Sequence, residues 1–153
     1  MNDGLKICIR PLVASDEPAW RDLWADYLRF YETEVSKDVY DTYFDRLIGN
    51  DPRDFNGLIA ELNGKPVGLT HYLFHRHGWR IEDVCYLQDL YVDPVARGTG
   101  LGRKLIEAVY EQADSVGAGS VYWLTQEFNY TARQLYDRIA KKTPFIQYSS
   151  PRR

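Results

Sequence analysis

The spacing of hydrophobic residues in the first third of the chain changes from a strand pattern to a helix pattern. Residues 5–9 alternate apolar and polar side chains, which predicts a half-buried strand that closes at Pro11. Between residues 20 and 31 the apolar positions recur every three or four residues, which predicts an amphipathic helix. Ser15 is its expected N-cap, because a hydroxyl there can accept a hydrogen bond from a free amide. The same spacing predicts a second, shorter helix at residues 39–48.

The middle of the chain has strand character throughout. Strands are predicted at residues 57–62, 65–75 and 81–92, each bounded by glycine, proline or asparagine. The dipeptide Asn63-Gly64 favours a two-residue hairpin, because both residues tolerate a positive φ. These strands should therefore form an antiparallel meander.

The last third returns to alternating helices and strands. A helix is predicted from Leu101 onward, a short central strand at residues 121–125, a helix at 131–140 and a last strand at 145–148. The order β-α-α-β-β-β-α-β-α-β predicts an α/β (α+β) fold with a mixed sheet and helices on its faces. We expect one domain, at residues 5–150, because 153 residues can bury one good core.

Composition excludes several classes of function. The net charge of −3 is wrong for a general nucleic-acid binder. No apolar run approaches the roughly 18 residues that span a bilayer, so we expect no membrane partner. The N-terminus has no apolar segment typical of a signal peptide. Cys8 and Cys85 have no metal or disulfide spacing, and we interpret them as reduced, buried thiols in a cytoplasmic protein.

A glycine-rich loop at residues 97–102 lies between a predicted strand and a predicted helix. Its three glycines let backbone amides approach an anion, and the helix N-terminus favours phosphate. Arg97, Arg103 and Lys104 add positive charge. A plain glycine turn before a solvated basic helix is the alternative. A P-loop is excluded because Arg103 follows the last glycine, and a Rossmann loop would follow the first strand of a parallel sheet.

Two motifs resemble one family. Leu90-Tyr91-Val92-Asp93-Pro94 with Arg97-x-x-Gly100-x-Gly102 resembles motif A of the GNAT superfamily of acyl-CoA N-acetyltransferases, and Asn129-x-x-Ala132-x-x-Leu135-Tyr136 resembles motif B. The predicted element order is similar to that family over almost the whole chain. The resemblance implies a mixed, mostly antiparallel sheet with helices on both faces and a splayed central strand pair. It also implies acetyl-CoA as the cosubstrate and transfer by direct attack, without a covalent enzyme intermediate.

The resemblance also assigns residues to the cosubstrate. Backbone groups of the splayed strand would bind the pantetheine arm, amides of the glycine loop would bind the pyrophosphate, and motif B would contact the arm. The candidates are Leu90, Tyr91, Val92, Arg97, Gly98, Thr99, Gly100, Leu101, Gly102, Arg103, Asn129, Ala132 and Tyr136.

Catalytic candidates follow from the same resemblance. Tyr136 matches the general acid that protonates the leaving thiolate, although a packed helix aromatic is the alternative. Gln88 stands where similar diamine N-acetyltransferases have a glutamate, and an amide cannot take a proton. Asp89, Glu82 and Asp83 therefore become the candidate bases, acting through water, and Asp89 is the first choice because it is nearest the cofactor strand. The alternative for Asp89 is a structural carboxylate near a bulge.

The expected wall of the amine site is acidic and aromatic. Residues 26–54 carry eight acidic and four basic side chains, a local charge of −4 that can steer a cation. Ordinary solvated helix charge is the alternative. The substrate-binding candidates, which include rings for cation–π contacts, are Tyr27, Tyr31, Glu32, Glu34 and Trp123.

The acceptor stays open at this point. The segments around Thr70-His71-Tyr72 and Trp123-Leu124-Thr125-Gln126 are similar to small GNAT enzymes, including fungal ones, that acetylate histones, polyamines or D-amino acids. A small-molecule amine is the first hypothesis, a protein lysine the second and a non-catalytic acyl-CoA-binding module the third. His71, His75 and His77 are expected to be strand-surface or substrate-channel residues, with no metal. The curtailed C-terminal end predicts a homodimer in which a partner covers the sheet edge.

Overall fold

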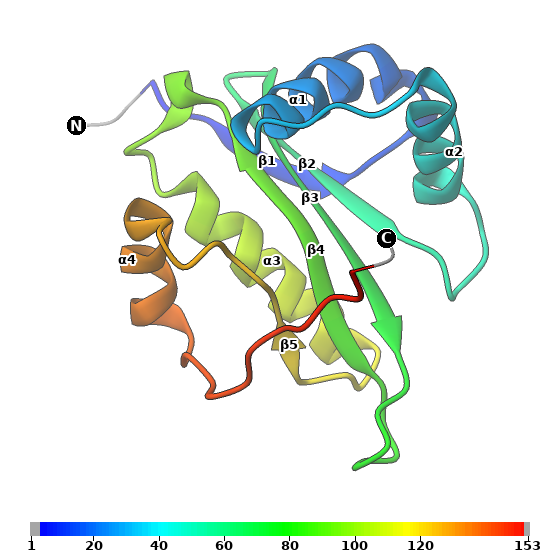
Figure 1. Cartoon of the computed structure of the whole chain (residues 1–153). Helices are drawn as coiled ribbons and strands as arrows, with labels where there is room; N and C mark the ends of the chain where they lie inside the picture. The colour runs from blue at the N-terminus through cyan, green and yellow to red at the C-terminus, as the bar shows by residue number, and fades with distance from the viewer. Residues whose placement is uncertain (1–3, 152–153) are drawn as a thin grey trace.

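The computed structural model describes residues 4–151, in which one five-stranded sheet carries helices on both faces (Figure 1). The strand order is β1-β2-β3-β4-β5; the first four strands are antiparallel, and β4 and β5 are parallel. This confirms the predicted mixed, mostly antiparallel sheet. The strands are β1 (Ile7–Pro11), β2 (Asn56–Leu62), β3 (Lys65–His75), β4 (Val84–Val92) and β5 (Val121–Tyr122).

Four α-helices form the outer layers. Helices α1 and α2 cover one face of the sheet, and α3 and α4 lie on the other (Figure 1). Among the described residues, no helix combines the length and the hydrophobicity needed to cross a bilayer. The helices are α1 (Glu17–Phe30), α2 (Lys37–Ile48), α3 (Leu101–Ser115) and α4 (Tyr130–Ile139).

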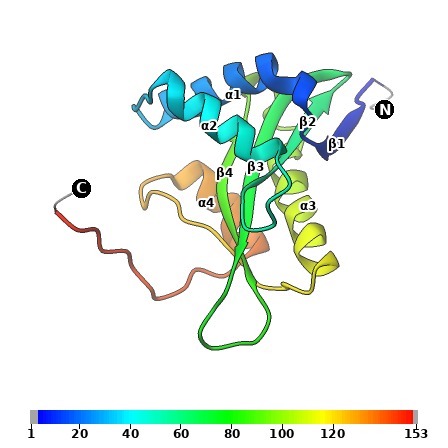
Figure 2. The ribbon, with the colours of Figure 1, turned by 90° about the vertical axis from the view of Figure 1, so that its right-hand side faces the viewer.

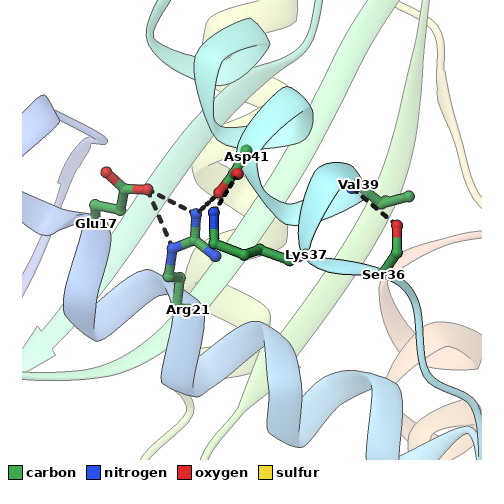
Figure 3. Close-up of polar contacts among 6 residues, drawn as sticks. All are labelled: Glu17, Arg21, Ser36, Lys37, Val39 and Asp41. Carbon is green, nitrogen blue, oxygen red and sulfur yellow. Dashed lines mark hydrogen bonds and ion pairs between the residues drawn. The ribbon is translucent and has the colours of Figure 1, made fainter.

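The helix starts differ in part from the prediction. Ser15 is not the N-cap of α1, because Ala14–Asp16 form a 3-10 turn and Ser15 lies inside it. The Asp16 carboxylate instead accepts a hydrogen bond from the Val13 amide at 2.8 Å. Helix α2 begins earlier than predicted, after Ser36, whose hydroxyl accepts from the Val39 amide at 3.4 Å (Figure 3).

The predicted hairpin is confirmed. Asn63 has φ 53° and Gly64 has φ 81°, the left-handed pair that a two-residue hairpin turn requires. The strands on either side have the bounds expected from the hydrophobic pattern, within one residue.

Each face of the sheet has its own hydrophobic core. Leu101, Leu105, Ile106 and Val109 of α3 are buried on one face. On the other face, α1 and α2 bury an aromatic cluster around Trp20, which is fully buried and lies 5.3 Å from Trp24 between ring centroids. Aromatic residues make up 14% of the chain, and several of them pack in the core under α1 and α2.

Three sequence predictions are wrong. The strand predicted at residues 121–125 has only two residues, and it lies at the edge of the sheet rather than in its centre. No strand forms at residues 145–148, because so short an edge offers little to pair with; Phe145 is 76% exposed. Figure 2 shows this C-terminal segment running away from the body as an extended chain. Cys8 is exposed rather than buried, because β1 is an edge strand with one covered face.

Candidate active site

Strands β4 and β5 separate almost as soon as they meet. β4 pairs with β3 along its length, but with β5 only at Cys85–Val121 and Tyr86–Tyr122. Within residues 4–151, the segment from Leu87 to Val92 therefore has no strand partner on its β5 side. This opening is the splayed strand pair that the family resemblance implied. Its backbone groups on that side are available to an extended ligand.

A β-bulge at Gln88 sets the direction of the next side chain. Tyr72 pairs with Leu87 and His71 pairs with Asp89, so Gln88 is the extra residue. Leu87 faces the α3 core, and in a regular strand residue 89 would face the same way. The bulge instead turns Asp89 toward α1 and α2, where its carboxylate contacts Tyr43.

The Asp89 carboxylate is buried among neutral hydrogen-bond donors. Asp89 is 5% exposed, and its Oδ2 accepts from His71 Nδ1 at 2.7 Å and from the Tyr43 hydroxyl at 2.5 Å. The Tyr27 phenol lies near enough to interact electrostatically with this carboxylate. Behind His71, the Trp20 indole donates to Nε2 at 2.9 Å. Because an indole N–H can only donate, His71 carries its proton on Nδ1.

These contacts fix the charge of the group. Burial alone would raise the pKa of Asp89, but the donors outweigh it and hold that pKa below its usual value. Burial and the Asp89 charge both raise the pKa of Tyr27 and of Tyr43. At neutral pH the site is therefore one carboxylate anion surrounded by protonated phenols. A carboxylate whose pKa is held below its usual value is a weak proton acceptor, which argues against Asp89 as the base.

His71 and Glu82 lie elsewhere than expected. His71 is fully buried, so the interpretation as a strand-surface or channel histidine is wrong; the bulge opposite it brings Asp89 to the same face. Glu82 is exposed in the loop between β3 and β4, 3.9 Å from Arg80. The strand from Val84 to Asp89 alone spans roughly 16 Å at 3.3 Å per residue, so Glu82 and Asp89 are not brought together.

Tyr136 lies on α4, half-buried beside the opening. Its ring packs edge-on against Trp123, with 5.4 Å between centroids. Burial raises the pKa of Tyr136 to about 12, and electrostatic interaction with Tyr31 adds to the rise. The phenols of α4 and of the end of α1 are thus within electrostatic range. Trp123 also packs against the α3 core and Tyr110.

The glycine loop has the geometry of an anion site. Gly98 and Gly100 have φ of 81° and 79°, and no atom lies within 4 Å of where a Cβ would stand on either. Gly100 is the N-cap of α3, whose first amides have no intrahelical acceptor. The amides of residues 98–100 likewise have no acceptor in the described part of the chain. Arg97 is exposed beside them, whereas Arg103 pairs with a glutamate one turn along α3.

The motif B residues lie at the start of α4. Asn129 is the residue before the helix, and its side-chain amide donates to the Thr125 hydroxyl at 3.3 Å. Ala132 and Tyr136 follow on the same helix, and both are half-buried. This places motif B on the chain that leaves β5, opposite the free side of β4.

The acidic wall is partly neutralised by local cations. Figure 3 shows Asp41 between Arg21 and Lys37, with Arg21 also bound to Glu17. Two further acids pair with arginines two or three residues away. This supports the reading of these acids as ordinary solvated charge. Glu32 and Glu34 are exposed at the end of α1 and beyond it.

Comparison with known proteins agrees with this geometry. The acetyltransferase (GNAT) family model matches residues 19–140. The D-amino-acid N-acetyltransferase HPA3 of Saccharomyces cerevisiae is 39% identical over 144 residues, which cover 94% of this chain and 89% of that protein. The thialysine N-epsilon-acetyltransferase of Bos taurus is 32% identical over 93 residues, 56% of this chain and 54% of that protein.

Solved structures share the fold at lower identity. The aminoglycoside N-acetyltransferase AAC(6')-Iy in complex with CoA matches with a TM-score of 0.84 and 18% identity, covering 99% of each chain. A ribosomal-protein-alanine N-acetyltransferase from Brucella melitensis biovar Abortus 2308 matches with a TM-score of 0.75 and 20% identity, covering 95% of this chain and 98% of that chain. The chain therefore belongs to the GNAT family of acetyltransferases and is an N-acetyltransferase.

Proposed function

We propose that this enzyme transfers an acetyl group from acetyl-CoA to the primary amine of a small molecule, with an amino acid preferred to a polyamine or diamine. The observation that carries the proposal is the β4–β5 opening, with a glycine-rich anion site at one end and the Asp89–tyrosine group on its α1–α2 side. D-amino-acid and thialysine acetyltransferases among the relatives support an amino acid as acceptor.

The residues present fit acetyl-CoA, which when bound supplies the acetyl group as a thioester. Its pyrophosphate would be held by the amides of residues 97–103, which have open space and no competing acceptor at 98–100. Its arm would lie along the unpaired backbone of residues 90–92, with Asn129 and Ala132 on the other side.

Tyr136 would act as the general acid. Its hydroxyl holds a proton at neutral pH, because burial raises its pKa to about 12. Tyr136 would give that proton to the sulfur as the thiolate leaves. The acceptor must lose a proton before it attacks, and the low pKa of Asp89 favours water as the immediate acceptor of that proton.

We also propose that the enzyme is a homodimer. The outer edge of β5 has no strand partner among the described residues, and the C-terminal segment exposes Phe145, Ile146 and Tyr148. An open sheet edge beside an extended apolar segment favours pairing with another chain. In such a dimer, the C-terminal segment of each copy would pair with the β5 edge of the other.

An acceptor panel tests the function. Thiol release from acetyl-CoA would be measured with D- and L-amino acids, lysine analogues, spermidine and a histone-tail peptide. We expect turnover with amino acids and little with the peptide. Turnover with the peptide alone would assign a protein acetyltransferase. No turnover despite normal acetyl-CoA binding would leave a binding module and overturn the proposal.

A further inference from the structure

Asp89 is, within residues 4–151, the one buried acid without a cationic partner, and its carboxylate lies on the α1–α2 side of β4. Its hydrogen-bond donors are His71 and Tyr43, and no lysine or arginine in residues 4–151 pairs with it. Burying an unpaired anion costs several kcal/mol or more, so such a group is rarely kept for stability alone. Asp16, the other buried acid, has its arginine, Arg10, at 2.8 Å.

His71 does not neutralise the negative charge of Asp89, because its imidazole ring is uncharged. Trp20 donates to Nε2, so Nε2 is an acceptor and the ring is neutral. His71 therefore gives Asp89 a hydrogen bond without a positive charge. The pair keeps a net charge of −1 inside the α1–α2 layer.

The phenol of Tyr27 connects this charge to the opening. Its hydroxyl interacts electrostatically with the Asp89 carboxylate, and its oxygen lone pairs can accept a hydrogen bond from another donor. The ring packs against Tyr31 at 5.0 Å, and Tyr31 is within electrostatic range of Tyr136.

We propose that Tyr27 Oη and the charge of Asp89 form the recognition site for the acceptor's ammonium group, and that His71 and Trp20 are positioning residues for Asp89. The ligand class is a primary ammonium group, which can donate to Tyr27 and is attracted by the anion behind it. This inference deepens the proposed function and rests on its choice of a small amine.

Binding of a simple amine tests the site without turnover. The probes are n-butylamine and its neutral counterpart 1-butanol, titrated into the CoA-bound enzyme by NMR. We expect Asp89→Asn to weaken butylamine binding about 30-fold and Tyr27→Phe about 10-fold, from the usual strength of charged hydrogen bonds. Butanol and CoA affinity should change less than about twofold. Asp38→Asn, the loss of an exposed acid on α2, is the matched control.

The positioning role is tested by pH. The titratable groups that face Asp89 are His71 of β3, Tyr27 and Tyr31 of α1, Tyr43 of α2 and Tyr86 of β4. Removing His71 takes away the largest effect that opposes burial and leaves the Tyr43 donor, so the pKa of the Asp89 carboxyl rises and the anion is lost as pH falls. His71→Leu should therefore lose butylamine binding on the acid side of neutrality. The amide of His71→Asn can replace the Nδ1 donor, so the butylamine affinity of this variant should not change with pH over the same range.

The outcomes separate the two proposals. Unchanged butylamine binding in Asp89→Asn, or the same acid loss in both His71 variants, would overturn the inference. If His71 is merely structural, both variants should have a lower melting temperature, and butylamine binding should not become weaker at acid pH in either. If Asp89→Asn does not fold, Tyr27→Phe and the His71 pair still decide. Asp89-dependent amine binding without acetyl transfer would refute the proposed function and leave this site standing.

Discussion

Replacing Tyr136 by phenylalanine removes one hydroxyl and keeps the ring that packs on Trp123. No hydrogen-bond partner of that hydroxyl is found among residues 4–151, so the free energy of unfolding should fall by less than about 0.5 kcal/mol. A general acid contributes about 100- to 10,000-fold to rate, so we expect kcat to fall by at least about 100-fold. Affinity for acetyl-CoA should change less than about twofold, because the backbone amides that bind it are untouched.

The assay is steady-state thiol release, with acetyl-CoA affinity measured by calorimetry. Tyr110→Phe is the matched control, because Tyr110 lies on the α3 side and its hydroxyl donates to the Ile139 carbonyl at 3.3 Å. That variant should lose some stability and keep its kcat. An unchanged kcat in Tyr136→Phe would refute the role as acid and leave Tyr136 as a packed aromatic.

The pH dependence gives a second check on Tyr136. Its pKa of about 12 keeps the hydroxyl protonated through the working range of the enzyme. Activity should therefore show no alkaline fall from this residue below about pH 10. A fall near pH 8 that disappears in Tyr136→Phe would contradict the raised pKa.

Three further predictions address the loop, the fold and the assembly. Gly100→Ala and Gly64→Ala each place a side chain at positive φ and should each cost about 1 kcal/mol in urea unfolding, but only Gly100→Ala should weaken acetyl-CoA binding. Asp16→Asn should remove stability at pH 7, because Arg10 lowers the pKa of Asp16; that stability is present above its unfolded pKa near 3.9 and is lost as pH falls. Deleting residues 141–153 should convert a dimer to a monomer in sedimentation, and a monomeric full-length chain would refute the dimer.

The parts of the site that were predicted depend on neighbouring residues. Residues 97–102 encode the turn and the helix start locally, since glycine permits positive φ and the helix supplies free amides. Asn63-Gly64 encodes its hairpin in the same way. The length and position of a short strand are not determined by its neighbouring residues in this way. At residues 121–125 the apolar run was compatible with a central strand, but the number of pairing partners decided its length and its edge position.

The parts that were missed depend on long-range contacts. Trp20 and His71 are 51 residues apart, and neither position differs in the sequence from ordinary core or strand positions. The bulge at Gln88 has no local signal either, yet it decides that Asp89 faces α1 rather than α3. The sequence therefore indicates Asp89 by its position on the strand, but it does not indicate the residues that hydrogen-bond to it.

The position of negative charge changes how the enzyme can select a cation. Exposed acids at residues 26–54 are screened by salt, and Asp41 is already bound by Arg21 and Lys37. Asp89 is buried among phenols and a neutral histidine, so its charge is less screened by salt. Steering by the surface would weaken at high salt, whereas recognition through Asp89 would persist. The salt dependence of the acceptor KM therefore distinguishes the two, and a KM that rises steeply with salt would assign recognition to the surface acids.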